Sequence, residues 1–139
     1  MAIKTDYLES CMNTMKMSLK FYHQEPVGGD VHLLAACTLA KNYELSLELA
    51  GKLLRKALST YHSNAQATRE LTYKEVLREA AKYRLIDVDA VERWFEYRDY
   101  RNTLAHDYGL LIVEEIPDFI EAYLDDLQNL IIAINAVKG

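Results

Sequence analysis

The chain has 139 residues, of which 50% are hydrophobic and 27% charged, a composition ordinary for one globular domain. Its net charge of −5 argues against a general nucleic-acid-coating surface, which would need a basic stripe. With 5 Gly and 2 Pro, it has little material for the many turns of a sheet protein. No apolar run approaches the roughly 20 residues that span a bilayer, and no signal peptide opens the chain, so we expect a cytoplasmic protein.

The first predicted helix extends from Asp6 to Gln24, because apolar side chains recur there at three- and four-residue steps. Those side chains are Leu8, Met12, Met15, Leu19 and Tyr22. The sequence Glu-Pro-Val-Gly-Gly at 25–29 then ends the helix. Asp30 is the expected N-cap of a long second helix that runs to about Tyr61.

Two groups of side chains on these helices are candidates for a metal, redox or phosphate-binding site. Cys11 and Cys37 match no metal or redox spacing, and we expect both to be reduced, small and buried. Lys52, Arg55 and Lys56 form a basic cluster near the end of the second helix. They are either a solvated face that suits the negative end of the helix dipole or contacts for phosphate, and both interpretations stay open.

Residues 62–70 are polar and aperiodic, and they predict a loop. Thr72 and Glu75 then form a capping box, in which each side chain accepts a hydrogen bond from a backbone amide at the start of a helix. This third helix is expected to be short and to end near Arg84. Asp87 follows as the expected N-cap of the fourth helix.

The fourth helix is predicted to run to about His106, and the last helix to begin between Ile112 and Pro117. Pro117 would lie in the first turn of the last helix or kink a helix that started earlier. A strong apolar stripe follows at Phe119, Ile120, Tyr123, Leu124, Leu127, Leu130, Ile131 and Ile134. Because no stretch alternates with period two, we predict an all-α fold: an antiparallel four-helix bundle with an additional short third helix.

The end of the fourth helix carries the most distinctive side chains. At about 100° per residue, Arg101 falls within an apolar arc, so it must be paired or face a partner surface. The apolar members of that arc are Ala90, Trp94, Tyr97, Leu104 and Tyr108. His106 lies roughly 140° round the helix from Arg101, beside Asn102 at the rim of the arc. On this arrangement alone, an ion-paired Arg101 and a surface His106 without a function stay open as the alternative.

Arg101, His106 and Tyr108 are spaced as Arg, four residues, His, one residue, Tyr. This spacing at the end of a helix resembles the signature of the HEPN superfamily. It resembles in particular that of the HepT-like toxins, which are also described as nucleotidyltransferase substrate-binding proteins.

The resemblance extends upstream of this motif. Residues 43–50 and 72–87 resemble the second- and third-helix segments of the family, and the resemblance covers roughly residues 35–135. The expected organisation is therefore a single HEPN domain over residues 1–139. One position departs from the pattern, because the family usually carries a Trp in the second helix where this chain has Gly51.

The resemblance implies a metal-independent endoribonuclease that needs no cofactor. RNA supplies its own nucleophile, the 2′-hydroxyl, and the products would end in a 2′,3′-cyclic phosphate. His106 would transfer protons, and Arg101 would stabilise negative charge on the phosphate oxygens. Asn102, about one turn from His106 on the same face, would orient the imidazole or the phosphate. The 4 histidines show no zinc-ligand spacing.

The resemblance also implies partners. In this family the motifs of two protomers face one cleft in a homodimer. A cognate MNT-type nucleotidyltransferase antitoxin silences the toxin by attaching AMP to the tyrosine of the motif, here Tyr108. Without the resemblance, Tyr108 is a core or interface tyrosine, one of 10 in the chain. The alternative function is a non-catalytic subunit that binds and presents substrate to the nucleotidyltransferase, with the motif used for modification or docking.

Overall fold

The computed structural model describes residues 3–62, 65–107, 112 and 115–137. In this part of the chain all regular structure is helical and no strand is present, which confirms the predicted all-α fold. The helices are α1 (Asp6–Gln24), α2 (Asp30–Leu58), α3 (Ala65–Arg69), α4 (Tyr73–Lys82), α5 (Ala90–Asp107) and α7 (Ile120–Asn135). None of the described helices has the length and apolar character that crossing a bilayer requires.

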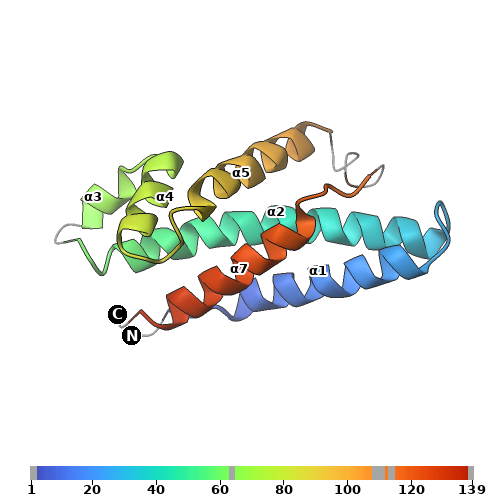
Figure 1. The fold of residues 1–139 in the computed structure, drawn as a ribbon, viewed down its shortest axis with the longest axis horizontal. Helices are drawn as coiled ribbons and strands as arrows, with labels where there is room; N and C mark the ends of the chain where they lie inside the picture. Colours follow the sequence, from blue (N-terminus) through green and yellow to red (C-terminus); the bar gives the residue numbers. More distant parts are fainter. Residues whose placement is uncertain (1–2, 63–64, 108–111, 113–114, 138–139) are drawn as a thin grey trace.

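The four longer helices form an antiparallel bundle (Figure 1). α1 and α2 make a long hairpin with the most extensive contact in the molecule, and α7 and α5 both pack against α2. The short α4 packs against α2 and α5, so it is an appendage to the bundle, as predicted. The start of α1 and the end of α7 lie at the same end of the bundle, where the Thr5 hydroxyl donates to Asn135 Oδ1 at 2.9 Å.

A cluster of aromatic side chains fills the space among α2, α5 and α7. Its fully buried members are Tyr43, Trp94, Tyr97 and Tyr123. The ring of Tyr123 lies 4.7 Å from that of Tyr43 and 4.9 Å from that of Tyr97, centroid to centroid, within range of favourable aromatic contact. The Tyr43 hydroxyl donates to the backbone carbonyl of Tyr97 at 2.7 Å. Burial raises the pKa of Tyr43 and of Tyr123 well above the ordinary value, so both phenols stay neutral.

The hairpin between α1 and α2 differs from the prediction in its cap. α1 has the predicted bounds, but Asp30 is the first residue of α2 and Gly29 is the N-cap, without a side-chain hydrogen bond. The turn is set by the backbone instead: the Gly29 amide donates to the Pro26 carbonyl at 3.1 Å, and Gly28 has a positive φ of 85°. The prediction that both cysteines are buried is wrong for Cys37, which is exposed.

The connection from α2 to α4 also differs from the prediction. α2 ends at Leu58, and the expected loop at 62–70 contains α3. A tertiary contact holds this segment, because Arg55 Nη1 of α2 donates to the backbone carbonyls of Thr68 at 3.3 Å and Leu71 at 2.8 Å. Local sequence does not reveal such a contact, which explains the error. The capping box is confirmed, with both of its predicted hydrogen bonds present.

α4 and α5 are joined by a tight reversal. α4 ends at Lys82, and Arg84 adopts a φ of 62°, a left-handed conformation that usually selects glycine. The amides of Arg84 and Leu85 donate back to the carbonyls of Ala81 and Ala80, the pattern of a Schellman motif. The predicted cap at Asp87 is wrong, because α5 begins at Ala90. The Asp87 carbonyl instead accepts the amide of Ala90 at 2.9 Å, in the turn before the helix.

The last helix begins later than predicted. Pro117 neither occupies the first turn of α7 nor kinks it, because the helix starts at Ile120 with Phe119 as N-cap. Pro117 lies in the preceding turn, where its carbonyl accepts the amide of Ile120 at 3.1 Å. The centroid of the Phe119 ring lies 5.2 Å from that of Tyr100 on α5, so an aromatic contact joins the N-cap of α7 to α5.

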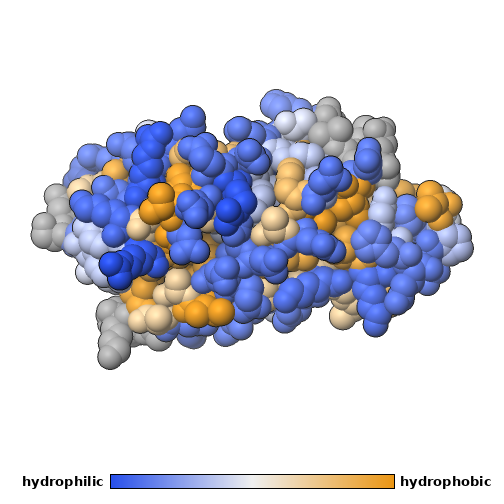
Figure 2. Space-filling model, in the orientation of Figure 1, coloured by the Kyte–Doolittle hydropathy of each residue, from blue (hydrophilic) through white to orange (hydrophobic). Residues whose placement is uncertain are grey.

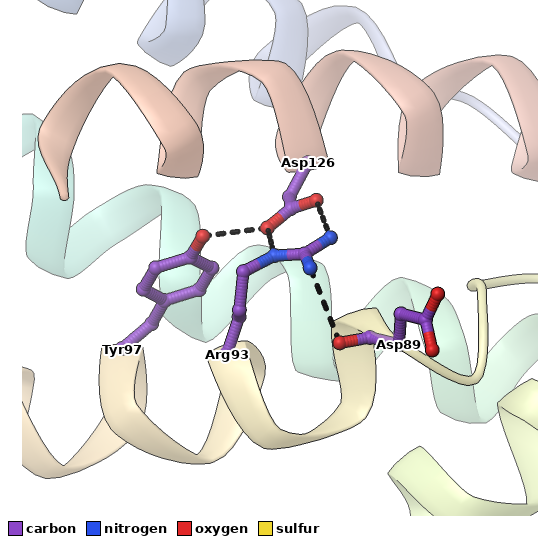
Figure 3. A network of polar contacts seen from close by, with 4 residues as sticks. All are labelled: Asp89, Arg93, Tyr97 and Asp126. Carbon is purple, nitrogen blue, oxygen red and sulfur yellow. Dashed lines mark hydrogen bonds and ion pairs between the residues drawn. The ribbon is translucent and has the colours of Figure 1, made fainter.

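A polar network around the buried carboxylate of Asp126 joins α5 to α7 (Figure 3). Arg93 donates from Nε and Nη2 to the two carboxylate oxygens of Asp126, each at 2.8 Å, and the Tyr97 hydroxyl donates to the same carboxylate. Arg93 Nη1 also donates to the Asp89 carbonyl at 3.2 Å. Asp126 is only 8% exposed, so its charge is tolerated because Arg93 and Tyr97 together satisfy it.

From this network we predict how removal of the Asp126 carboxylate changes the free energy of unfolding. Asp126→Ala should lower the free energy of unfolding by about 2 kcal/mol, because the bidentate pair is lost and the buried Tyr97 hydroxyl loses its acceptor. Asp125→Ala is the matched control, because Asp125 is the preceding residue on α7 and is exposed. Urea unfolding measures both variants. Equal stabilities for Asp126→Ala and Asp125→Ala would contradict the role assigned to the network.

Candidate functional site

The predicted apolar arc of α5 is confirmed for its described members. Ala90, Trp94, Tyr97 and Leu104 are all buried, whereas Tyr108 lies outside the described residues. Arg101 is half-buried at the edge of this face, and Asn102 and His106 are exposed. His106 therefore faces solvent. The structure thus places all three predicted catalytic residues on the accessible side of one helix.

Arg101 has no carboxylate partner within the described part of the chain. Its one hydrogen bond there runs from Nη1 to Asn102 Oδ1 at 3.5 Å, at the outer limit for such a bond. The ion-pair interpretation of Arg101 is therefore not supported among these residues. A guanidinium held at the edge of the core without a negative partner has its planar fork of donors available for an anion.

Asn102 contacts Arg101 and not the imidazole of His106. Both orienting roles predicted for Asn102, towards the imidazole and towards the phosphate, stay predictions. His106 lies four residues after Asn102, so the two side chains are neighbours on the helix surface. We call the part of α5 that carries Arg101, Asn102 and His106 the accessible strip. It contains a proton-transfer group and a cation about 7.5 Å apart along the helix axis and roughly 140° apart around it, at 1.5 Å and about 100° per residue.

Arg101 also lines a pocket of about 190 Å³ among α2, α4 and α5. We call it the basic pocket; its lining residues are Leu47, Glu48, Gly51, Lys52, Arg55, Tyr73, Arg98 and Arg101. Four of these described residues are cations and one is a carboxylate. Figure 2 shows hydrophilic side chains, with hydrophobic ones between them, over α4 and the adjoining half of α5. An acidic protein thus carries a local concentration of positive charge beside its candidate catalytic arginine.

Sequence reasoning missed two members of this pocket, Tyr73 and Arg98. The guanidinium of Arg98 lies over the ring of Tyr73, 4.3 Å from its centroid, in a cation–π contact. Burial raises the pKa of Tyr73 to about 12, although Arg98 and Arg101 pull it down, so the phenol is neutral at physiological pH. The available signal was the spacing of Arg98, Asn102 and His106, which recur at four-residue steps.

The basic cluster predicted on α2 divides between two roles. Arg55 is partly buried and holds the α3–α4 connection, so it serves the fold as well as the pocket. Lys52 is exposed and pairs with Glu48 at 3.4 Å, an exposed pair of little strength. Lys56 is exposed and is not among the pocket residues. Gly51 faces the Tyr73 ring, and a Cβ there would lie 3.8 Å from Tyr73 Cε2.

A larger cavity of about 280 Å³ lies between the start of α5 and α7, away from the motif. Asp126 lines it, but Arg93 and Tyr97 already bind that carboxylate. The cavity therefore offers less for a ligand than its size suggests. The basic pocket is smaller and carries cations that have no carboxylate partner, so we treat it and the accessible strip of α5 as the candidate site.

Residues 6–136 match the model of a family described as "Nucleotidyltransferase substrate binding protein like". A curated relative from Haemophilus influenzae, named "Probable ribonuclease HepT", is 29% identical over 84 residues, which are 58% of this chain. The match spans 56% of the length of that relative. A solved structure from the same organism superposes with a TM-score of 0.77, covering 94% of this chain and 98% of that one at 20% identity. It is described as the fold of a substrate binding domain of a nucleotidyltransferase, and the likeness shows a shared fold.

Proposed function

Because the chain belongs to the nucleotidyltransferase substrate binding protein like family, we propose that it is the ribonuclease toxin of a two-component module. The second component would be an MNT-type nucleotidyltransferase that acts as antitoxin. The observation that carries the proposal is the unpaired, half-buried Arg101 on the same accessible strip of α5 as His106. The name of the curated relative, a probable ribonuclease, supports the proposal.

The proposed reaction needs only groups that the chain and RNA provide. The imidazole of His106 from one protomer accepts the proton of the 2′-hydroxyl, and the 2′-oxygen attacks the adjacent phosphorus. The bond from phosphorus to the 5′-oxygen breaks, and that oxygen receives a proton, which leaves a 5′-hydroxyl and a 2′,3′-cyclic phosphate. Arg101 binds the non-bridging oxygens as their negative charge grows, and Asn102 orients the imidazole or the phosphate.

A second copy of the chain would complete this site. The reaction needs one group that accepts a proton and one that donates a proton, and each protomer offers one histidine on this strip. We therefore propose a C2 homodimer in which the α5 strips of two protomers face one cleft, since a two-fold axis presents the same patch to itself. The exposed His106 and the half-buried Arg101 support it. Light scattering that found only monomer at micromolar concentration would contradict the dimer.

The first prediction from this function concerns the two reacting groups. His106→Ala and Arg101→Ala should each lower RNA cleavage at least about 100-fold, because proton transfer and charge stabilisation are each typically worth that much. Addition of EDTA should leave the rate unchanged. The measurement is cleavage of a labelled RNA by purified protein. Both side chains are accessible, so circular dichroism should show an unchanged fold.

Glu96→Ala is the control on the same helix, because Glu96 is exposed and lies off the accessible strip. It should cleave at the wild-type rate. Loss of wild-type activity on chelation would contradict the metal-free reaction. Full activity in His106→Ala would contradict the assignment of the accessible strip as the catalytic site.

The second candidate function is a non-catalytic subunit that presents substrate to the nucleotidyltransferase. The likeness to a fold described as a substrate binding domain of a nucleotidyltransferase favours it. Both functions involve Tyr108, which follows the end of α5 at Asp107 and lies outside the described residues. They differ in what its modification does, since an adenylate near Arg101 and His106 would block a catalytic phosphate site by charge and bulk.

Co-expression with the nucleotidyltransferase partner should therefore add one adenylate to Tyr108 and abolish ribonuclease activity. Tyr108→Phe removes the acceptor oxygen, so this variant should stay active and should escape modification. Intact-protein mass spectra and growth on induction measure the two effects. If Tyr108→Phe blocks modification while growth is unaffected with or without the partner, the substrate-presenting subunit is the better account. Adenylate at another residue would contradict the proposed control.

A further inference from the structure

We propose that the basic pocket binds a phosphate of the RNA strand beyond the scissile one, so that the strand runs along α5 from His106 towards Arg98. The inference rests on the proposed function, and it assigns a role to Lys52, Arg98 and Tyr73 that neither the motif nor the family description provides. Its ligand is defined by chemistry as a phosphodiester of single-stranded RNA.

The first support is the continuity between the pocket and the motif. Arg101 belongs to both, since it lines the pocket and contacts Asn102. Arg98, Asn102 and His106 lie on one row of α5 at four-residue steps. The row places Arg98 about 12 Å from His106 along the helix axis. A stacked strand advances about 3.4 Å per nucleotide, so a strand that touches both ends contacts more than one phosphate.

The second support is the balance of charge in the pocket. Arg98 and Arg101 have no carboxylate partner in the described part of the chain, and Lys52 has only an exposed pair with Glu48. Such a pair contributes little, so Lys52 can turn towards a phosphate at small cost. The chain as a whole carries −5, so this cluster is not a consequence of composition. A neighbouring anion would offset repulsion among the three cations.

The third support is the shape of the pocket. The cation–π contact with Tyr73 holds the guanidinium of Arg98 in one orientation, so less freedom is lost when it binds an anion. Gly51 lines the pocket without a side chain, and a Cβ added there would lie at ordinary contact distance, 3.8 Å, from Tyr73 Cε2. Position 51 is therefore a place where the pocket can be filled without changing any charge.

The experiment measures the affinity of single-stranded RNA for His106→Ala protein, so that no probe is cleaved. Fluorescence anisotropy follows two labelled probes, a dinucleotide and a longer oligonucleotide, across a range of salt concentrations. Lys52→Gln and Arg98→Gln should each weaken binding of the longer RNA about fivefold to tenfold and reduce its salt slope by about 0.7. The dinucleotide, which reaches only the motif, should bind all variants equally.

Four further variants distinguish the effects of charge and of pocket shape from general loss of structure. Lys20→Gln removes an exposed lysine of α1 outside the pocket, and it should change neither affinity nor slope. Gly51→Leu should weaken the longer RNA while keeping every charge. Gly51→Ala should bind normally and unfold at a higher urea concentration than the parent protein, because alanine is favoured over glycine within a helix. Arg98→Lys keeps the positive charge that Arg98→Gln removes. Its affinity for the longer RNA should therefore show the same salt slope as the parent protein.

The outcomes distinguish the pocket from the proposed function. Unchanged affinity of the longer RNA in Lys52→Gln, Arg98→Gln and Gly51→Leu would overturn the pocket assignment, even if wild-type protein cleaves RNA. Loss of affinity in these variants would support the pocket, even if wild-type protein cleaves nothing and the proposed function fails. If AMP binds the pocket as tightly as the longer RNA, with the same dependence on Lys52, the ligand is a free nucleotide and the RNA assignment is overturned.

Discussion

The rotation of α5 about its own axis is the constraint on which the candidate site depends. Each residue turns the helix by about 100°, so a slip of one residue would move His106 and Arg101 to other faces. The buried hydrogen bonds of Tyr97 prevent such a slip: its carbonyl accepts from Tyr43 of α2, and its hydroxyl donates to Asp126 of α7. Because these bonds are buried, breaking them leaves polar groups without partners. The core thus fixes which α5 side chains reach solvent.

That orientation gives α5 two chemically different edges. The buried edge supplies Trp94 and Leu104 to the core, and the accessible strip supplies the proton-transfer group His106 and the unpaired cation Arg101. The basic pocket continues this strip towards α2 and α4. A protein with a net charge of −5 repels nucleic acid at long range, so attraction to a phosphate backbone must come from this short-range cluster. The same property would make binding local and dependent on salt.

Sequence patterns predicted the helices whose determinants are local. The stripe of α1 and the capping box of α4 depend on residues a few positions apart, and both are confirmed. Tertiary contacts determined what the sequence did not reveal: Arg55 holds α3, and Phe119 packs on α5 before α7 begins. The reversal at Arg84 escaped prediction because an arginine occupies a position that usually belongs to glycine.

The candidate site divides in the same way. The motif at Arg101 and His106 is visible in the sequence because its residues share one helix. The pocket is not, because Tyr73 and Lys52 come from other helices and meet Arg98 only in the fold. Gly51 illustrates the difference: the sequence shows only that the usual tryptophan is absent, whereas the structure shows the Tyr73 ring facing that position. Departures from a family pattern thus acquire meaning from the neighbours that the fold provides.

The central claim is that the strip of α5 cleaves RNA with the 2′-hydroxyl as nucleophile. Mass spectrometry of the products of one purified RNA, cleaved by wild-type protein, tests this claim most directly. The account predicts 2′,3′-cyclic phosphate at one new end and a 5′-hydroxyl at the other, and no cleavage where the nucleotide before the scissile bond is 2′-deoxy. A 5′-phosphate at the new end, or cleavage at the deoxy position, would contradict it.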